Sequence, residues 1–293
     1  MAGHLQPMRP RHDMRDEAMA LQGIRILEAR PGWHFIGFKD IWRYRELLYF
    51  LTWRDIKVRY KQTVLGAAWA ILQPIATVLA FSLFFGRVAA NPHAAVPYPL
   101  FVLCGILPWT FFAGAVSSAS QSVIGNQGLV TKIYFPRLII PMGAIAACLV
   151  DFAIALALLL ATMVYYSVAP AATILLVPVL LVALLALAIG VGTLLAALTV
   201  EYRDFRYVIA FMLQIWMFAT PAIYLQAEVG LDPRWRTILV NPLNGLIENF
   251  RLAVLGGSLD TSTLAASSIS SALLFVVGCL YFRRVERKFA DVI

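Results

Sequence analysis

The chain has 293 residues, of which 61% are apolar and 14% charged, and its formal net charge is +8. A soluble domain of this length carries charge on roughly a quarter of its residues, so this composition excludes an ordinary soluble fold and predicts that most of the chain lies in a bilayer. The cysteines lie far apart in apolar runs, without C-x-x-C or metal-ligand spacing, and are interpreted as small buried hydrophobes: Cys104, Cys148 and Cys279.

The N-terminal residues 1–39 are polar and contain no apolar h-region, which predicts a cytoplasmic tail without a cleavable signal peptide. Residues 40–63 are predicted to form an amphipathic helix, with Arg54, Lys57 and Lys61 on one face at i, i+3 and i+7. Thr52 followed by Asp55 resembles a capping box, so a second helix is expected to begin near Trp53. The apolar stripe consists of Tyr44, Leu47, Leu48 and Leu51. A membrane-surface anchor is the simpler interpretation of this segment, and a docking surface for a partner is the alternative.

A membrane-spanning helix needs about 20 mainly apolar residues. Six stretches meet this requirement: 64–86, 100–120, 138–167, 173–199, 207–225 and 262–282. The predicted fold is therefore an all-α polytopic membrane protein whose six-helix domain covers residues 64–282.

Lysine and arginine residues are distributed unequally between the two sides of these spans. One side holds 20 of them, in residues 1–63, the connections around 121–137 and 200–206 and the tail 283–293, whereas the other side holds 4. This bias predicts a multi-pass protein with both termini in the cytoplasm. Topology alone accounts for the positions of the basic residues, which argues against nucleic-acid binding.

Residues 226–258 follow the fifth span on the outer side and are too charged to cross the bilayer. Apolar runs nevertheless recur in this segment, and Gly256–Gly257 can form a turn. Two short re-entrant or interfacial helices are predicted here, buried in protein or lining a watery cavity.

Sequence motifs of catalysis are absent. The chain has no G-x-x-x-x-G-K-[ST], H-E-x-x-H or G-x-S-x-G motif, so neither a nucleotide site, a metal site nor a catalytic residue is predicted. Asp151, near the middle of the third span, is a candidate functional residue because ionisable groups at that depth are costly. A hydrogen bond to a neighbouring helix, or a neutral carboxyl, is favoured over proton relay, since relays use chains of such groups.

Short motifs in a fixed order carry a family resemblance. Arg59-Tyr60-Lys61-Gln62-Thr63-Val64-Leu65-Gly66-Ala67-Ala68-Trp69, followed by Gln73-Pro74, enters the first span. Later motifs are Gly105, Pro108-Trp109, Phe111-Phe112, Asn126, Leu129, Lys132, Tyr134-Phe135-Pro136-Arg137, Arg203-Asp204, Thr220-Pro221, Tyr224, Asn241-Pro242, Phe250-Arg251 and Phe289-Ala290-Asp291. The ordered set resembles type-2 ABC transporter permeases that export O-antigen, capsule and teichoic acid chains.

This resemblance implies a homodimer that binds two copies of a separate cytoplasmic ABC ATPase and moves an undecaprenyl-type lipid-linked glycan across the bacterial inner membrane. ATP and Mg²⁺ would belong to the ATPase, and this chain would carry no cofactor of its own. The coupling connection 121–137 would contain a helix from about Ser122 to Tyr134, and 226–258 would gate the periplasmic exit.

The resemblance also assigns residues to roles. The substrate entrance would comprise Arg54, Lys57, Arg59, Tyr60, Lys61, Leu65, Gly66 and Trp69. The positively charged Arg and Lys side chains of this set would attract the pyrophosphate of the lipid carrier. ATPase coupling would use Asn126, Leu129, Lys132 and Tyr134. The channel and gate would use Trp109, Phe112, Trp216, Tyr224, Asn241, Glu248 and Arg251, with Asp151 as an intramembrane polar group. Aromatic side chains at such positions either pack in the protein or line a path for sugars.

Alternatives from other classes are a type-2 ABC exporter of a small drug or lipid, an integral-membrane glycosyl- or acyltransferase, and a proton-coupled transporter. The basic entrance argues against the first, and the lack of an acidic or His-rich loop argues against the second. Only Asp151 supports the third. The predominance of arginine over lysine favours a Gram-negative inner membrane, and hence O-antigen over capsule or teichoic acid.

Overall fold

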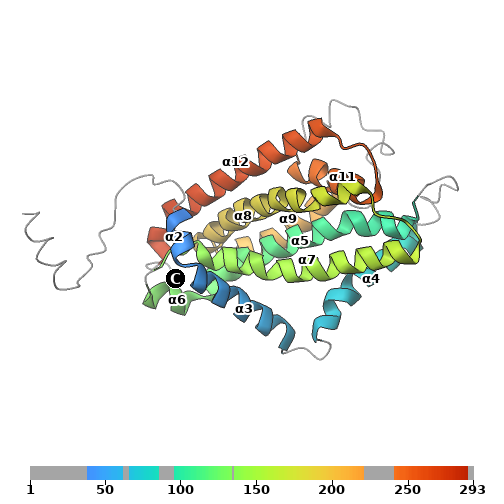
Figure 1. Ribbon diagram of the computed structural model, residues 1–293. Coiled ribbons are helices and arrows are strands. Elements are labelled where there is room, and N and C mark those ends of the chain that lie inside the picture. Colours follow the sequence, from blue (N-terminus) through green and yellow to red (C-terminus); the bar gives the residue numbers. More distant parts are fainter. Residues whose placement is uncertain (1–37, 62–65, 86–95, 134, 221–240, 290–293) are drawn as a thin grey trace, which may run out of the picture. The chain divides into compact units, whose positions relative to one another are not determined.

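The computed structural model describes residues 38–61, 66–85, 96–133, 135–220 and 241–289. Within these ranges every regular element is helical (Figure 1). The helices are α2 (Phe38–Arg43), α3 (Arg45–Lys61), η1 (Gly66–Ala68), α4 (Trp69–Phe85), α5 (Tyr98–Gly125), α6 (Gln127–Lys132), α7 (Ile139–Tyr165), η2 (Ala172–Leu176), α8 (Val177–Glu201), α9 (Phe205–Phe218), α11 (Pro242–Leu255), α12 (Thr261–Val285) and η3 (Glu286–Lys288).

Four helical segments are long and apolar enough to cross a bilayer: Tyr98–Gly125, Ile139–Tyr165, Ala172–Glu201 and Thr261–Val285. They confirm the second, third, fourth and sixth predicted spans. The other two predicted spans correspond to α4, with 17 residues, and α9, with 14 residues. At 1.5 Å per residue these helices measure about 25 Å and about 21 Å, below the roughly 30 Å of bilayer hydrocarbon. Six full spans therefore remain a prediction.

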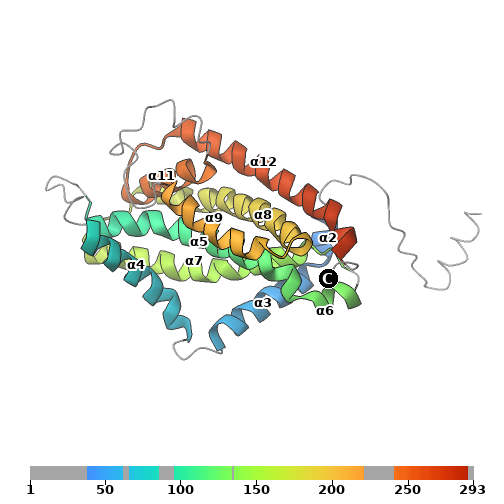
Figure 2. The ribbon, with the colours of Figure 1, turned by 180° about the vertical axis from the view of Figure 1, so that it is seen from behind.

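The core is built around α5, which packs against α7, α8, α11, α4 and α9. Its side chains join those of α7, α8 and α11 in one large apolar cluster. The helix α12 lies along α8, and α9 lies on the rear side of the bundle beside α5 and α8 (Figure 2). Pro97 at the N-cap of α5 and Asp260 at the N-cap of α12 mark where two of these helices begin. The hydrogen bond from the Ser262 hydroxyl to Asp260 holds the pKa of that carboxyl below its ordinary value.

A second apolar cluster lies where α5, α8 and α12 end and α7 begins. Phe282 and Phe289 pack edge to face in it, with ring centroids 5.2 Å apart. Arg137 donates a hydrogen bond to the backbone oxygen of Glu286. Burial raises the pKa of the Glu286 carboxyl. The connections predicted to share one side of the membrane thus meet at one end of the bundle.

The prediction of a second helix near Trp53 was wrong. The helix α3 runs without a break from Arg45 to Lys61, and the chain bends earlier, between α2 and α3. The Thr52 hydroxyl donates to the Leu48 oxygen at 2.8 Å, a bond inside the helix, so Thr52 caps nothing. The predicted apolar stripe of α3 does face the protein, because Leu51 is buried and Tyr44, Leu47 and Leu48 pack against the second cluster.

Candidate functional site

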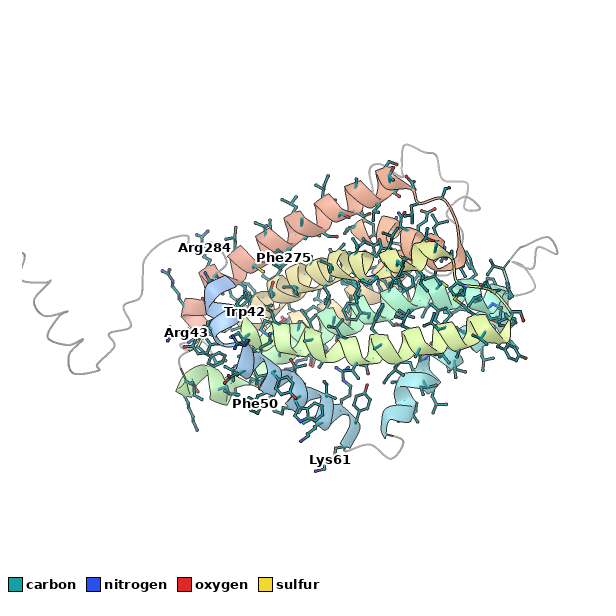
Figure 3. The ribbon with its side chains drawn as sticks, in the orientation of Figure 1. Trp42, Arg43, Phe50, Lys61, Phe275 and Arg284 are labelled. Carbon is teal, nitrogen blue, oxygen red and sulfur yellow. The ribbon has the colours of Figure 1, made fainter. Side chains whose placement is uncertain are left out.

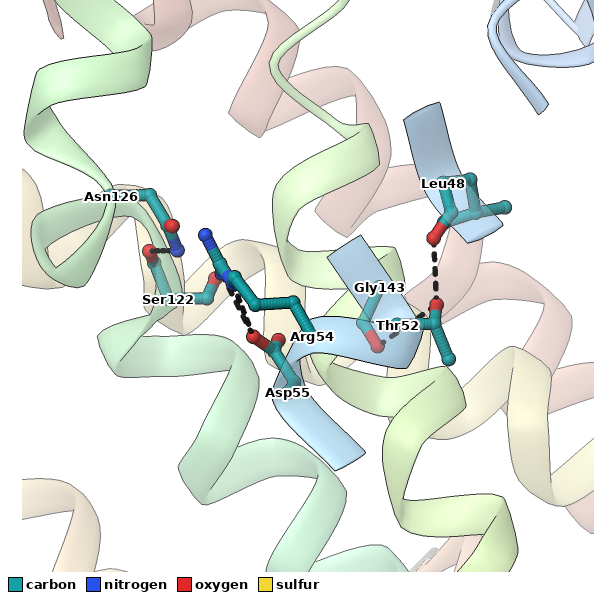
Figure 4. A network of polar contacts seen from close by, with 7 residues as sticks. All are labelled: Leu48, Thr52, Arg54, Asp55, Ser122, Asn126 and Gly143. Carbon is teal, nitrogen blue, oxygen red and sulfur yellow. Dashed lines mark hydrogen bonds and ion pairs between the residues drawn. The ribbon is translucent and has the colours of Figure 1, made fainter. Parts of the chain in front are cut away.

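The helix α3 packs along α7 and runs in the same direction. Near its middle, the Thr52 hydroxyl is 3.4 Å from the Gly143 oxygen of α7 (Figure 4). Near its end, α3 reaches Asp151, which lies 12 residues into α7 and therefore about 18 Å from the start of that helix. The last turn of α3 is thereby brought to the middle of the third span.

Asp151 is the centre of a polar cluster between these two helices. Arg59 donates to Oδ2 of Asp151, and the Tyr60 hydroxyl donates to Oδ1. The side chains of Arg59 and Asp151 remain about one-third exposed, at 35% and 34%. Nη2 of Arg59 also lies 3.5 Å from Sγ of Cys148 on α7. Burial, together with the hydrogen bond to Asp151, raises the pKa of the Tyr60 hydroxyl. Asp151 thus hydrogen-bonds a neighbouring helix.

The other cations predicted at the entrance lie on the same helix. Arg54 donates to Asp55 through Nε at 3.1 Å and Nη2 at 2.8 Å (Figure 4). The ammonium of Lys57 lies 5.3 Å from the ring centroid of Trp53. Lys61 ends the helix and points away from the bundle (Figure 3). Among the described residues, only Arg54 and Arg59 of these four cations have a carboxylate within ion-pair distance.

The turn before α4 is formed by η1. Gly66 has a φ of +50°, a conformation that an L side chain rarely adopts, which explains the glycine in the Leu65-Gly66 motif. Trp69 follows and is 54% exposed. Leu65, the remaining predicted entrance residue, lies outside the described residues.

The predicted coupling helix from Ser122 to Tyr134 is divided in two. The helix α5 ends at Gly125, and α6 begins at Gln127 after Asn126, whose Nδ2 donates to the Ser122 oxygen at 2.8 Å (Figure 4). Leu129 packs against the second apolar cluster, whereas Lys132 is exposed. Tyr134 lies outside the described residues. A cavity of about 430 Å³ opens beside α6. It is lined by Ile124, Gln127, Val200, Arg203, Asp204, Arg206 and Tyr207.

Several predicted channel and gate residues meet where α9 approaches α11. The Trp216 indole N–H donates to Oδ1 of Asn241 at 2.9 Å, and Nδ2 of Asn241 donates to the Thr220 hydroxyl at 2.9 Å. Oδ1 of Asn241 also accepts from the backbone N–H of Leu243, which caps α11. The rings of Phe112 and Trp216 meet edge to face with centroids 5.2 Å apart. The side-chain amide of Asn241 thus joins the end of α9, in the fifth predicted span, to the start of α11.

The remaining predicted gate residues are placed differently. Trp109 and Phe112 are buried in the core of this chain, so neither ring faces a path within it. Arg251 is also buried, with its guanidinium carbon 3.8 Å from the Phe101 ring centroid, and Glu248 is half-buried on the same helix. Tyr224 lies outside the described residues.

Sequence reasoning missed the partners of the predicted residues. Asp55, Cys148 and Thr220 each contact one of them, but only Thr220 belonged to the ordered set of motifs that carries the family resemblance. No group of three or more His, Cys, Asp or Glu side chains that could hold a metal occurs in the described ranges.

Comparison with known proteins identifies a family and several relatives of this chain. Residues 46–255 match the family described as ABC-2 type transporter. An O-antigen export system permease protein RfbA from Myxococcus xanthus is 28% identical over 260 residues, which cover 87% of this chain and 98% of that protein. An RfbA permease from Klebsiella pneumoniae is 25% identical over 250 residues, covering 85% and 95%. The polysialic acid transport protein KpsM from Escherichia coli is 24% identical over 239 residues, covering 80% and 91%.

The family match extends from the start of α3 to the end of α11, so it includes the Arg59–Asp151 cluster, the helices on both sides of Asn126 and the contact between Trp216 and Asn241. The long apolar helices and these three sites therefore occur together in a multi-pass membrane protein that belongs to the ABC-2 type transporter family.

Proposed function

We propose that this chain is the membrane-spanning permease subunit of an ATP-driven exporter that moves lipid-linked O-antigen across the bacterial inner membrane. The observation that carries this proposal is the similarity to O-antigen export permeases over 85% or more of this chain and 95% or more of each relative. Export of a capsule polysaccharide is the second candidate, favoured by the similarity to KpsM.

A second copy of the chain is proposed to complete the channel. The helices α4 and α9 expose large apolar side chains, including Leu79, Leu83, Phe211 and Phe218 at 64%, 76%, 65% and 65%. Lipid can cover such surfaces. The interior of one chain, however, is a packed apolar core, so the channel for a hydrophilic glycan is proposed to form between two chains.

ATP and Mg²⁺ are proposed to bind a separate cytoplasmic ATPase, present in two copies, that contacts α6. Both termini then lie in the cytoplasm, because the basic end of the bundle faces inward. The lipid carrier enters beside α3, where Arg54, Lys57, Arg59 and Lys61 attract its pyrophosphate. ATP-driven motion of the permease subunits relative to one another then threads the glycan outward.

Deleting the gene is expected to leave lipid-linked glycan on the cytoplasmic side and to remove the polymer from the cell surface. Restoring the gene should restore surface polymer, which is measured by immunoblotting of lipopolysaccharide. Normal surface polymer in the deletion strain would contradict the proposal.

Lys132→Glu is expected to weaken ATPase binding by about tenfold. The introduced carboxylate would repel the group on the ATPase that the Lys132 ammonium attracts. Binding of the purified ATPase to the permease in nanodiscs measures this effect. Lys132→Arg keeps the charge and serves as the control, with affinity close to wild type. Equal affinities for the two variants would show that Lys132 lies outside the ATPase contact.

A further inference from the structure

The Arg59–Asp151 pair carries a further inference, which rests on the proposed function. We propose that Asp151 is a resident counter-ion that occupies Arg59 in the empty transporter, and that the pyrophosphate of the lipid carrier displaces it. Asp151 thereby acts as a positioning residue. It lowers the affinity of Arg59 for anions and makes the entrance selective for a strongly charged head group, without contacting the substrate.

Access to the pair supports an exchange. About one-third of each side chain is left uncovered by this chain, so an anion in the proposed entrance can reach the guanidinium without opening the helix bundle. Where the proposed entrance admits water, a partly uncovered ion pair contributes little to stability, whereas breaking a fully buried pair leaves a costly unpaired charge. The pair is therefore weak enough for a stronger anion to replace one partner.

The hydrogen bonds of Asp151 make the exchange tolerable for the protein. Arg59 and Tyr60 donate to different oxygens of the carboxylate, so release of Arg59 leaves Oδ1 bonded to the Tyr60 hydroxyl. The carboxylate keeps its place on α7 through this remaining bond. Without Tyr60, departure of Arg59 would leave a charge at mid-span with no partner among the described side chains.

The incoming group is the stronger partner for Arg59. A pyrophosphate diester carries two negative charges and several acceptor oxygens, and guanidinium binds phosphate in a bidentate manner. A neutral lipid or a carrier with an uncharged head offers no such gain and leaves Arg59 on Asp151. The pair thus favours carriers with a charged diphosphate over other lipids of the same chain length.

The test compares variants of the permease bound to its ATPase in nanodiscs, with farnesyl pyrophosphate as the probe and farnesol as the uncharged control. Asp151→Asn removes the competing charge but keeps an acceptor for Tyr60. It is expected to bind farnesyl pyrophosphate about threefold to fivefold more tightly than wild type, the range of an exposed ion pair. Farnesol binding should stay the same. In an Arg59→Gln background, Asp151→Asn should have no effect on either ligand.

Asp204→Asn is the matched control, because Asp204 is exposed and its side chain makes no capping hydrogen bond to α9. It should leave both affinities unchanged. Equal or weaker binding of farnesyl pyrophosphate by Asp151→Asn overturns the counter-ion role alone. A wild type that binds farnesyl pyrophosphate no better than farnesol overturns both this role and the proposed entrance.

A second measurement uses the wild type and does not depend on how well the variants fold. Displacement of Arg59 exposes the Asp151 carboxyl, so farnesyl pyrophosphate should increase modification of Asp151 by a hydrophobic carbodiimide, detected by peptide mass spectrometry. Farnesol should not increase it. Unchanged modification, or protection by farnesyl pyrophosphate, overturns the displacement.

Discussion

Gly278→Ala is expected to destabilise the protein by about 3 kcal/mol, because the added methyl group meets backbone that cannot move aside. A Cβ at Gly278 would collide with the backbone oxygen of Gly190 and lie 3.0 Å from its Cα. The reverse contact is equally close, since a Cβ at Gly190 would meet the backbone of Leu274 and Phe275. The two helices, α8 and α12, touch through these glycines and would have to separate.

Gly114→Ala is the control for this substitution. Gly114 lies in α5, and a Cβ there would meet nothing within 4 Å. Alanine forms helix more readily than glycine by about 1 kcal/mol, so this variant should be neutral or slightly stabilised. Unfolding of both variants in mixed micelles, together with surface polymer in cells, gives the comparison. Equal stability of the two variants would show that α12 does not pack on α8 as described.

Asn241→Ala is expected to lower stability by about 2 kcal/mol or more and to impair export. The substitution removes the N-cap of α11 and leaves the Trp216 N–H without its acceptor, and each loss costs roughly 1 kcal/mol or more. It also uncouples the fifth predicted span from the outer helix, because Asn241 bonds both Trp216 and Thr220.

Asn244→Ala provides the matched control one turn further along α11. Oδ1 of Asn244 is buried and has no hydrogen-bond partner among the described residues, so its removal should be neutral or stabilising. Unfolding free energy and the rate of polymer appearance at the surface are measured for both variants. Identical behaviour of the two would remove Asn241 from the link between α9 and α11.

Hydropathy and length were sufficient to predict four spans to within a few residues, because a continuous apolar run of about 20 residues has few other folds available. They were less informative for the first and fifth spans. The described helices there, α4 and α9, are both shorter than the predicted spans 64–86 and 207–225, and α9 begins two residues before its predicted span. Apolar composition alone does not show where a helix begins or ends.

Contacts between distant residues could not be predicted. Arg59 and Asp151 are 92 positions apart, and no periodicity connects a residue of an entrance helix with one in the third span. The sequence marked Asp151 as unusual because of its depth, but it offered no partner. The contact of Gly190 with Gly278 was likewise invisible, since glycine in an apolar helix is compatible with packing against protein or lipid.

Local polar chemistry was misinterpreted where two patterns fit the same residues. Thr52 and Asp55 have the spacing of a capping box, but the Thr52 hydroxyl bonds back to Leu48 and Asp55 pairs with Arg54. Packing of Leu51 into the second apolar cluster keeps the helix continuous through this point. Tertiary burial therefore outweighed the local capping preference.

The most direct test of the proposed function is the ATPase activity of the purified complex in nanodiscs, measured with and without lipid-linked O-antigen. The permease and its ATPase should co-purify, and the lipid-linked glycan should stimulate ATP hydrolysis, whereas a hydrophobic drug or a lipid without glycan should not. Stimulation by the drug or plain lipid, with none by the lipid-linked glycan, would contradict the assignment as a polysaccharide exporter.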